Sequence, residues 1–197
     1  TLIKDANLLR RLTLSMVGRL PSEIEKQTIE EKGLDALDEV LDQIMKEEAF
    51  YIRLKEGFND IFLTEGYEGN GELILSYNHF EKSRLWYQKY NLDHIVDEKE
   101  RKETLYSITR NYRKAIREEP LELVAYVVRN NKPFTEILTA DYIMVSPYSA
   151  RGYGIFEQIK NRFKDAEDPF EYVPARLPAL RARNNNPVNA PLEQESK

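Results

Sequence analysis

The sequence predicts an all-α protein: an irregular multi-helix domain with an extended C-terminal tail rich in proline and asparagine. Apolar residues recur at the 3.6-residue period of an amphipathic helix along nearly the whole chain. No strand–helix alternation, hairpin dipeptide or fixed-period repeat points to another class. From Pro174 onward, prolines recur too closely for a helix to form. We therefore assign residues 1–173 to one helical domain and residues 174–197 to the tail.

The N-terminal third predicts four helices. The spacing of Ser22 and Glu25 is that of a capping box and begins the second helix, while Gly18 and Gly33 close the first two. Three of the helices carry apolar stripes, formed by Leu8, Leu9, Leu12 and Met16, by Leu34, Leu37, Val40, Leu41, Ile44 and Met45, and by Tyr51, Leu54, Phe58, Ile61 and Phe62. Three glycines within residues 66–71 then indicate a loop.

The remaining elements are predicted in order. An aromatic-rich segment over residues 73–90 is expected to be helical, and a charged helix follows it. Pro120 fits the first turn of the next helix, which the run at 130–133 ends. The inward positions of these two helices are Leu105, Ile108, Tyr112 and Ile116, then Leu121, Val124, Val127 and Val128. A short helical turn over 134–139, an irregular connection over 141–147 and a helical stretch near 148–163 complete the domain.

Composition excludes several classes of protein. No apolar run approaches the ~18 residues of a membrane-spanning helix. With 29 Lys and Arg against 34 Asp and Glu, the net charge is −5, so we expect no nucleic-acid partner. The chain contains no cysteine, which excludes disulfides, thiolate metal sites, a cysteine nucleophile and covalent haem attachment within these residues.

The sequence assigns no catalytic, cofactor-binding or metal-ligating residue. His79 and His94 are predicted to be structural or solvated, with a zinc site or haem ligation as alternatives. Carboxylate pairs such as Glu118 and Glu119 fit a solvated helix face, with an acid–base dyad as the alternative. The glycine-rich segment 65–72 is expected to be a plain loop, with a calcium-stabilised module as the alternative.

Two groups of apolar residues are candidates for protein contacts. The first is aromatic and predicts either core packing or a protein–protein interface; it comprises Trp86, Tyr87 and Tyr90. The second lies in the tail and would anchor a strap against a partner or against the rest of the same protein; it comprises Leu177, Leu180 and Val188. A disordered tail is the alternative.

Four ordered motifs resemble one protein family. Residues 8–14 and 18–22 read LLRRLTL and GRLPS, and residues 48–54 and 59–67 read EAFYIRL and NDIFLTEGY. Residues 131–142 read NKPFTEILTADY, and residues 145–154 read VSPYSARGYG. Together they are similar to the motifs of the planctomycete-type cytochrome-c-associated domains of unknown function. We expect structural roles for the motif arginines Arg11, Arg19 and Arg53, which would tie helices together through carboxylates.

The resemblance implies an exported bacterial protein of the periplasm or cell surface, with no established catalytic residue. This chain would be its N-terminal part, and a c-type haem would be held beyond Lys197 or on a partner chain. The function expected on this basis is a helical scaffold or interaction module of an electron-transfer assembly, without chemistry of its own. The alternative is a surface hydrolase fragment that acts on a polysaccharide through a cleft of carboxylates and aromatics near Trp86.

Overall fold

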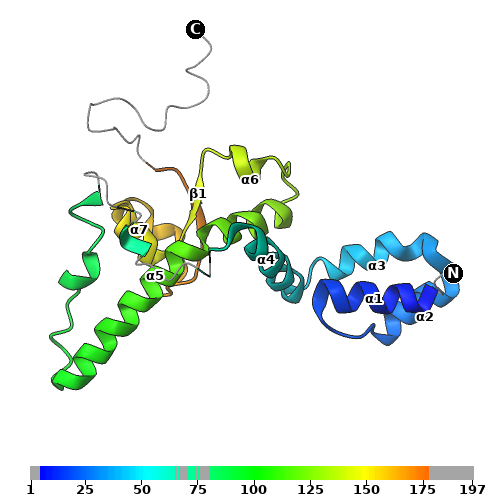
Figure 1. The fold of residues 1–197 in the computed structure, drawn as a ribbon, viewed down its shortest axis with the longest axis horizontal. Coiled ribbons are helices and arrows are strands. Elements are labelled where there is room, and N and C mark those ends of the chain that lie inside the picture. The colour runs from blue at the N-terminus through cyan, green and yellow to red at the C-terminus, as the bar shows by residue number, and fades with distance from the viewer. Residues whose placement is uncertain (1–4, 65, 67–70, 74, 76–79, 178–197) are drawn as a thin grey trace, which may run out of the picture. The chain divides into compact units, whose positions relative to one another are not determined.

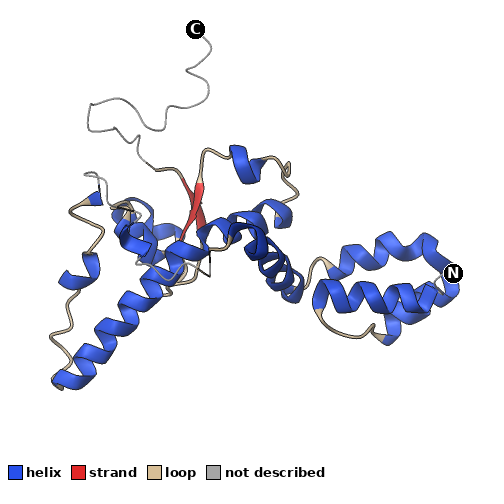
Figure 2. Ribbon diagram, in the orientation of Figure 1, coloured by secondary structure: helices blue, strands red, loops and turns tan. Residues whose placement is uncertain are grey.

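The computed structural model describes residues 5–64, 66, 71–73, 75 and 80–177 (Figure 1). The described chain is mainly helical, which confirms the predicted all-α class (Figure 2). It divides into two compact units: the first comprises Thr1–Phe62 with Val124–Pro133, and the second comprises Leu63–Leu123 with Phe134–Lys197. The boundary at residue 173 stays a prediction. Within the described residues, no helix combines the length and apolar composition needed to cross a bilayer.

Residues 5–62 of the first unit form four α-helices and one 3₁₀ turn, at the positions that the apolar stripes predict. These elements are α1 (Asp5–Val17), α2 (Glu23–Lys32), η1 (Gly33–Ala36), α3 (Leu37–Ile44) and α4 (Glu48–Phe62). Their core is apolar and buries Leu9, Val17, Ile29, Ala36, Val40 and Ile44. On α4, Tyr51 is buried, whereas Ile61 at the edge of the predicted stripe is exposed.

Arg19 fastens the first unit together. The predicted capping box is present, because the Ser22 hydroxyl accepts from the Glu25 amide and the Glu25 carboxylate accepts from the Ser22 amide. Arg19 donates to both oxygens of Glu25, at 2.9 and 2.6 Å, and also pairs with Glu47 just before α4. The structural role expected for Arg19 is therefore confirmed. Arg53 instead pairs with Glu56 on its own helix, at 3.0 Å, so this pair joins no two helices.

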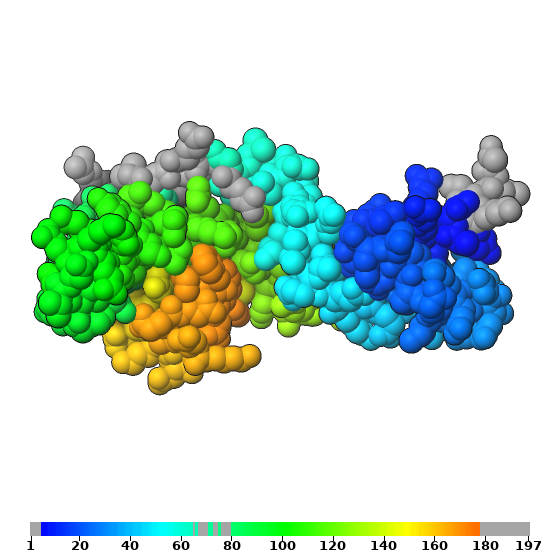
Figure 3. All heavy atoms as spheres, turned by 90° about the horizontal axis from the view of Figure 1, so that it is seen from below, coloured from blue at the N-terminus to red at the C-terminus, as the bar shows by residue number. Residues whose placement is uncertain are grey.

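One long helix, α5 (Glu98–Arg129), supports the second unit, and the helix boundary predicted at Pro120 is wrong. Pro120 lies inside α5 and removes one backbone donor. The neighbouring turn is held from outside, because the Tyr172 hydroxyl donates to the Ala115 carbonyl oxygen at 3.0 Å. Figure 3 shows the segment that carries Tyr172, in orange, against α5, in green. Burial of Ala115 and Leu121 on either side of the proline favours one continuous helix over two.

The helix predicted over residues 73–90 is also wrong. Its described residues form turns and two 3₁₀ segments, η2 (Gly71–Leu73) and η4 (Trp86–Lys89). The residues that this part of the chain buries are Leu75, Phe80, Tyr87 and Leu92, which follow one another at intervals of 5, 7 and 5 residues. Each step of five residues turns an α-helix by about 140°, so the four side chains cannot lie on one face of a helix, and burial of the large side chains decides the local backbone.

A two-stranded sheet occupies part of the connection predicted to be irregular. Strand β1 (Ile143–Val145) pairs antiparallel with β2 (Val173–Ala175), and Met144 lies opposite Pro174. Three-residue strands are too short for alternation to reveal them in the sequence. The neighbouring elements are α6 (Glu136–Thr139), α7 (Pro147–Gly152), α8 (Phe156–Ile159) and η5 (Lys160–Arg162).

The predicted tail begins inside this sheet, because residues 174 and 175 belong to β2. Leu177 packs against the apolar cluster of Val145, Ala150, Ile155, Phe163 and Ala175. Leu180 and Val188 lie outside the described residues. The partner-binding role of these three side chains stays a prediction.

Candidate functional site

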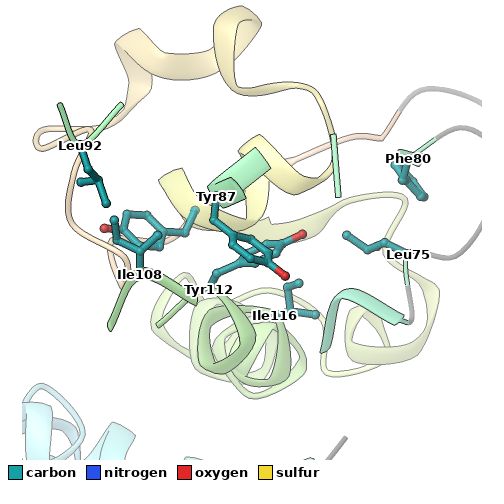
Figure 4. Packing of buried hydrophobic residues seen from close by; sticks show 8 residues of the cluster. Leu75, Phe80, Tyr87, Leu92, Ile108, Tyr112 and Ile116 are labelled. Atoms are coloured by element: carbon teal, nitrogen blue, oxygen red, sulfur yellow. The ribbon is translucent and has the colours of Figure 1, made fainter. Parts of the chain in front are cut away.

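The second unit encloses a core rich in aromatic side chains against one side of α5 (Figure 4). We call this cluster the aromatic core; it comprises Leu75, Phe80, Tyr87, Leu92, Ile108, Tyr112, Ile116 and Tyr148, with Trp86, Tyr90 and Tyr153 packed against it. The Trp86 ring meets four tyrosine rings edge to face, with centroid distances of 5.2 Å to Tyr148, 5.6 Å to Tyr112, 5.7 Å to Tyr90 and 6.4 Å to Tyr87. Each such contact adds about 0.5–1.5 kcal/mol beyond the burial of its area. The core-packing interpretation accounts for the positions of Trp86, Tyr87 and Tyr90, and their role in a protein interface stays a prediction.

Glu72 forms a buried ion pair at the edge of this core. Glu72 is 3% exposed. Its carboxylate accepts from Arg113, whose Nε lies 3.0 Å from Oε1 and 2.9 Å from Oε2. The Arg113 Nη2 also donates to Oε1, at 2.6 Å. The hydrogen bond to Glu72 raises the pKa of Arg113, and burial raises the pKa of Tyr87, whose hydroxyl lies 3.3 Å from Oε1. The pair fixes the η2 turn on α5. Gly71 lies so close to the Arg113 backbone that an added Cβ would be 3.2 Å from its carbonyl oxygen.

Glu119 is a buried carboxyl group that accepts a hydrogen bond from a tyrosine hydroxyl. The Tyr153 hydroxyl donates to Oε2 at 2.6 Å, whereas Oε1 is buried without a hydrogen-bond partner among the described residues. Burial raises the pKa of Glu119 to about 8, against the lowering effect of the Tyr153 and Ser149 hydroxyl groups. At neutral pH the group is therefore mostly protonated, and burial also raises the pKa of Tyr153 well above its ordinary value.

Tyr112 is packed against the turn that ends α7. Its side chain is fully buried, and a Cβ added at Gly152 would lie 2.0 Å from its hydroxyl oxygen. Glycine is thus required at residue 152 by the close approach of α5. Burial raises the pKa of Tyr112, and the charge of Glu72 raises it further.

Arg151 joins the aromatic core to the loop after η5. Its guanidinium carbon lies 3.9 Å from the ring centroid of Phe156 and 5.3 Å from that of Trp86, and it pairs with Glu167 at 2.7 Å. The same carboxylate accepts from the Tyr90 hydroxyl at 2.7 Å. Burial and this bond raise the pKa of Tyr90 to about 12.

The described residues bring together proton-holding groups and no metal centre. Among them, no cluster of three or more His, Cys, Asp or Glu side chains is placed to hold a metal ion. His94 is exposed, whereas His79 lies outside the described residues. Most of the loop over 65–72 is also outside them, and Glu72, one of its proposed oxygen ligands, is paired with Arg113.

The hydrolase alternative gains no support from this arrangement. A glycosidase needs one carboxyl group as acid and a second as nucleophile or base, both facing the sugar. Glu72 is bound by Arg113, and Glu119 lies in the interior, where it accepts from Tyr153. Trp86 belongs to the aromatic core.

Sequence reasoning missed that Glu72 and Glu119 are buried in the second unit. The solvated face predicted for the pair Glu118 and Glu119 is wrong for Glu119, which is 7% exposed. Glu119 follows Tyr112 by seven residues, two helical turns, and so lies on the buried face of α5. That spacing is the signal by which it could be found. No comparable signal marks Glu72, because its partner Arg113 is 41 residues away.

A family model described as PSD4: Protein of unknown function (DUF1592) matches residues 78–155. The matched segment contains Trp86, Tyr112, Glu119 and Arg151, and therefore most of the aromatic core described above. No curated protein and no solved structure matches the chain. The similarity shown is thus to a domain of unknown function.

Proposed function

We propose that this chain is a helical interaction module of an exported, cytochrome-c-associated bacterial protein, and that it serves an electron-transfer assembly without chemistry of its own. The family model supports the presence of a domain of unknown function over residues 78–155 and nothing more specific. The haem would be held by the remainder of the protein or by a partner chain. Export and the electron-transfer setting rest on the motif resemblance.

The observation that carries the proposal is the internal pairing of the ionisable groups in the second unit. Arg113 pairs with Glu72, and the Tyr153 hydroxyl donates to Glu119. Groups that act on a substrate must face it and change partners during the reaction. Groups that hold each other in the interior instead set a rigid scaffold, because breaking a buried pair costs several kcal/mol.

Isolation of the protein from its native source tests this function. Peptide mass spectrometry and a reduced-minus-oxidised absorption spectrum are measured on the same sample. The proposal expects a polypeptide with a Cys-x-x-Cys-His motif, on the same or another chain, and the absorption band of a c-type haem in proportion to this chain. A haem-free monomer with the mass of this chain alone would contradict it.

A further inference from the structure

The first five turns of α5 carry a concentration of positive charge in an acidic protein. Residues 98–117 contain seven basic and three acidic side chains, a net charge of 7 − 3 = +4. The whole chain has a net charge of −5, so the remaining residues sum to −5 − 4 = −9. The basic residues are Lys99, Arg101, Lys102, Arg110, Arg113, Lys114 and Arg117.

Six of these seven lie on one side of the helix. Positions three and four apart share a face of an α-helix, and the positions of these residues follow this spacing. The six are Lys99, Lys102, Arg110, Arg113, Lys114 and Arg117, and Tyr106 lies on the same side between Lys102 and Arg110. We call this set the basic face. Ile108 and Tyr112 lie on the opposite side of α5 and are buried in the aromatic core (Figure 4). The basic face therefore lies opposite the core over its N-terminal turns, whereas near its C-terminal end Arg113 reaches back to Glu72 and the Nε of Arg117 is buried.

The centre of the basic face is uncovered. Tyr106 is 72% exposed, and Arg110, one turn further along, is exposed and pairs with no carboxylate among the described residues. The lysines at the N-terminal end are paired only along the helix, Lys102 with Glu98 at 2.7 Å and Lys99 with Glu103 at 3.9 Å. Such exposed pairs contribute little, so a partner's carboxylates can replace them at small cost.

We propose that the basic face, with Tyr106 at its centre, is a docking surface for an acidic protein. This inference deepens the proposed interaction function by naming its surface and the charge of the partner. Tyrosine and arginine are the residues enriched at protein interfaces, especially where binding energy concentrates. Positive charge on one helix also steers an acidic partner toward it.

A protein fits this surface better than a nucleic acid does. Glu98, Glu100 and Glu103 stand in the same turns as the lysines and would face the phosphates of any strand laid along the helix. Binding to nucleic acid rests on phosphate neutralisation by a continuous basic surface. A protein partner can place cations opposite these glutamates and carboxylates opposite Arg110.

Fluorescence anisotropy with a labelled 20-residue poly-L-glutamate peptide tests the surface in the full chain. The variants are Arg110→Glu and Tyr106→Ala on the basic face, and Arg162→Glu as the matched control, because Arg162 is an exposed arginine on η5. We expect wild type and Arg162→Glu to bind alike at low salt, Arg110→Glu to lose at least about tenfold in affinity, and Tyr106→Ala to lose several-fold. Binding of the wild type should weaken as salt rises.

Three results would overturn the proposal. Equal losses in Arg110→Glu and Arg162→Glu would show a response to net charge alone. Tighter, Arg110-dependent binding of a 20-nucleotide single-stranded DNA than of the peptide would assign the face to nucleic acid. Arg110-dependent self-association of the wild type at low salt would assign it to a second copy. Should Arg110→Glu not fold, Lys102→Glu replaces it, since Lys102 is exposed and held only by a pair within its own helix.

The two proposals fail separately. A native haem polypeptide that stays bound in Arg110→Glu contradicts the docking surface and leaves the interaction function in place. Loss of peptide binding in Arg110→Glu, without any haem polypeptide in the native sample, supports the surface and contradicts the electron-transfer setting.

Discussion

Replacing Glu119 with glutamine should remove a pH dependence from the stability of the second unit. The folded protein holds the carboxyl proton up to a pKa of about 8, whereas the ordinary value is 4.5. Between these values the folded chain binds more protons than the unfolded chain does. Stability therefore falls as pH rises through this window. The stabilising contribution of the protonated Glu119 is lost in full above about pH 8.

The size of the effect follows from the two pKa values. They differ by about 3.5, and at 1.36 kcal/mol per pH unit the group costs the folded state up to about 5 kcal/mol at pH 8. Glutamine stays neutral at every pH, and its side-chain oxygen can still accept from the Tyr153 hydroxyl, 2.6 Å away in the wild type. Glu119→Gln should thus match the wild type near pH 5 and exceed its stability by several kcal/mol at pH 8.

Urea unfolding at pH 5, 6.5 and 8 measures this difference through the fluorescence of Trp86, the single tryptophan, which lies in the same unit. Glu157→Gln is the matched control, because Glu157 is an exposed residue of α8 paired only with Lys160. Its profile should run parallel to that of the wild type. Parallel profiles for Glu119→Gln and the wild type across the same range would refute the reasoning.

Three further substitutions test the packing around the aromatic core and the first unit. Gly152→Ala should lower the free energy of unfolding by about 1–3 kcal/mol, because the added Cβ would lie 2.0 Å from the buried Tyr112 hydroxyl. Gly57→Ala, which has open space around it, should raise that free energy by up to about 1 kcal/mol. Thermal unfolding measures both, and equal effects would contradict the packing argument. Arg113→Met should cost about 3 kcal/mol in urea unfolding by leaving the Glu72 charge buried, and replacing both partners with apolar residues should recover most of it; no recovery would contradict the pairing. Arg19 lowers the pKa of the capping-box carboxylate through their hydrogen bond, so wild type should lose stability relative to Arg19→Met as pH falls below about 4.5, and an unchanged difference in acid unfolding would count against that link.

Helical periodicity predicted the first unit well because its elements bury regular stripes. The capping box of Ser22 and Glu25 and the ends at Gly18 and Gly33 are local signals, and local signals are visible in a sequence. The predicted stripes contain Leu9, Val40 and Ile44 of its apolar core, whereas Val17, Ile29 and Ala36 lie outside every predicted stripe.

The second unit was harder to predict because distant contacts decide its backbone. Tyr172 supports α5 from 57 residues away, and Arg113 fixes Glu72 from 41 residues away. A proline that ordinarily begins a helix is held inside one, and aromatic side chains that suggest a helix face instead determine a chain of turns. The same contacts bury Glu119, which composition alone places on a solvated face.

Zero-length cross-linking of the natively isolated protein, which joins lysines to carboxylates in contact, tests the account most directly. We expect cross-links from Lys99, Lys102 or Lys114 on the basic face to carboxylates of a polypeptide that bears a Cys-x-x-Cys-His motif. Mass spectrometry of the joined peptides identifies both ends. A haem polypeptide joined only through other lysines of this chain, or no intermolecular cross-link at all, would contradict it.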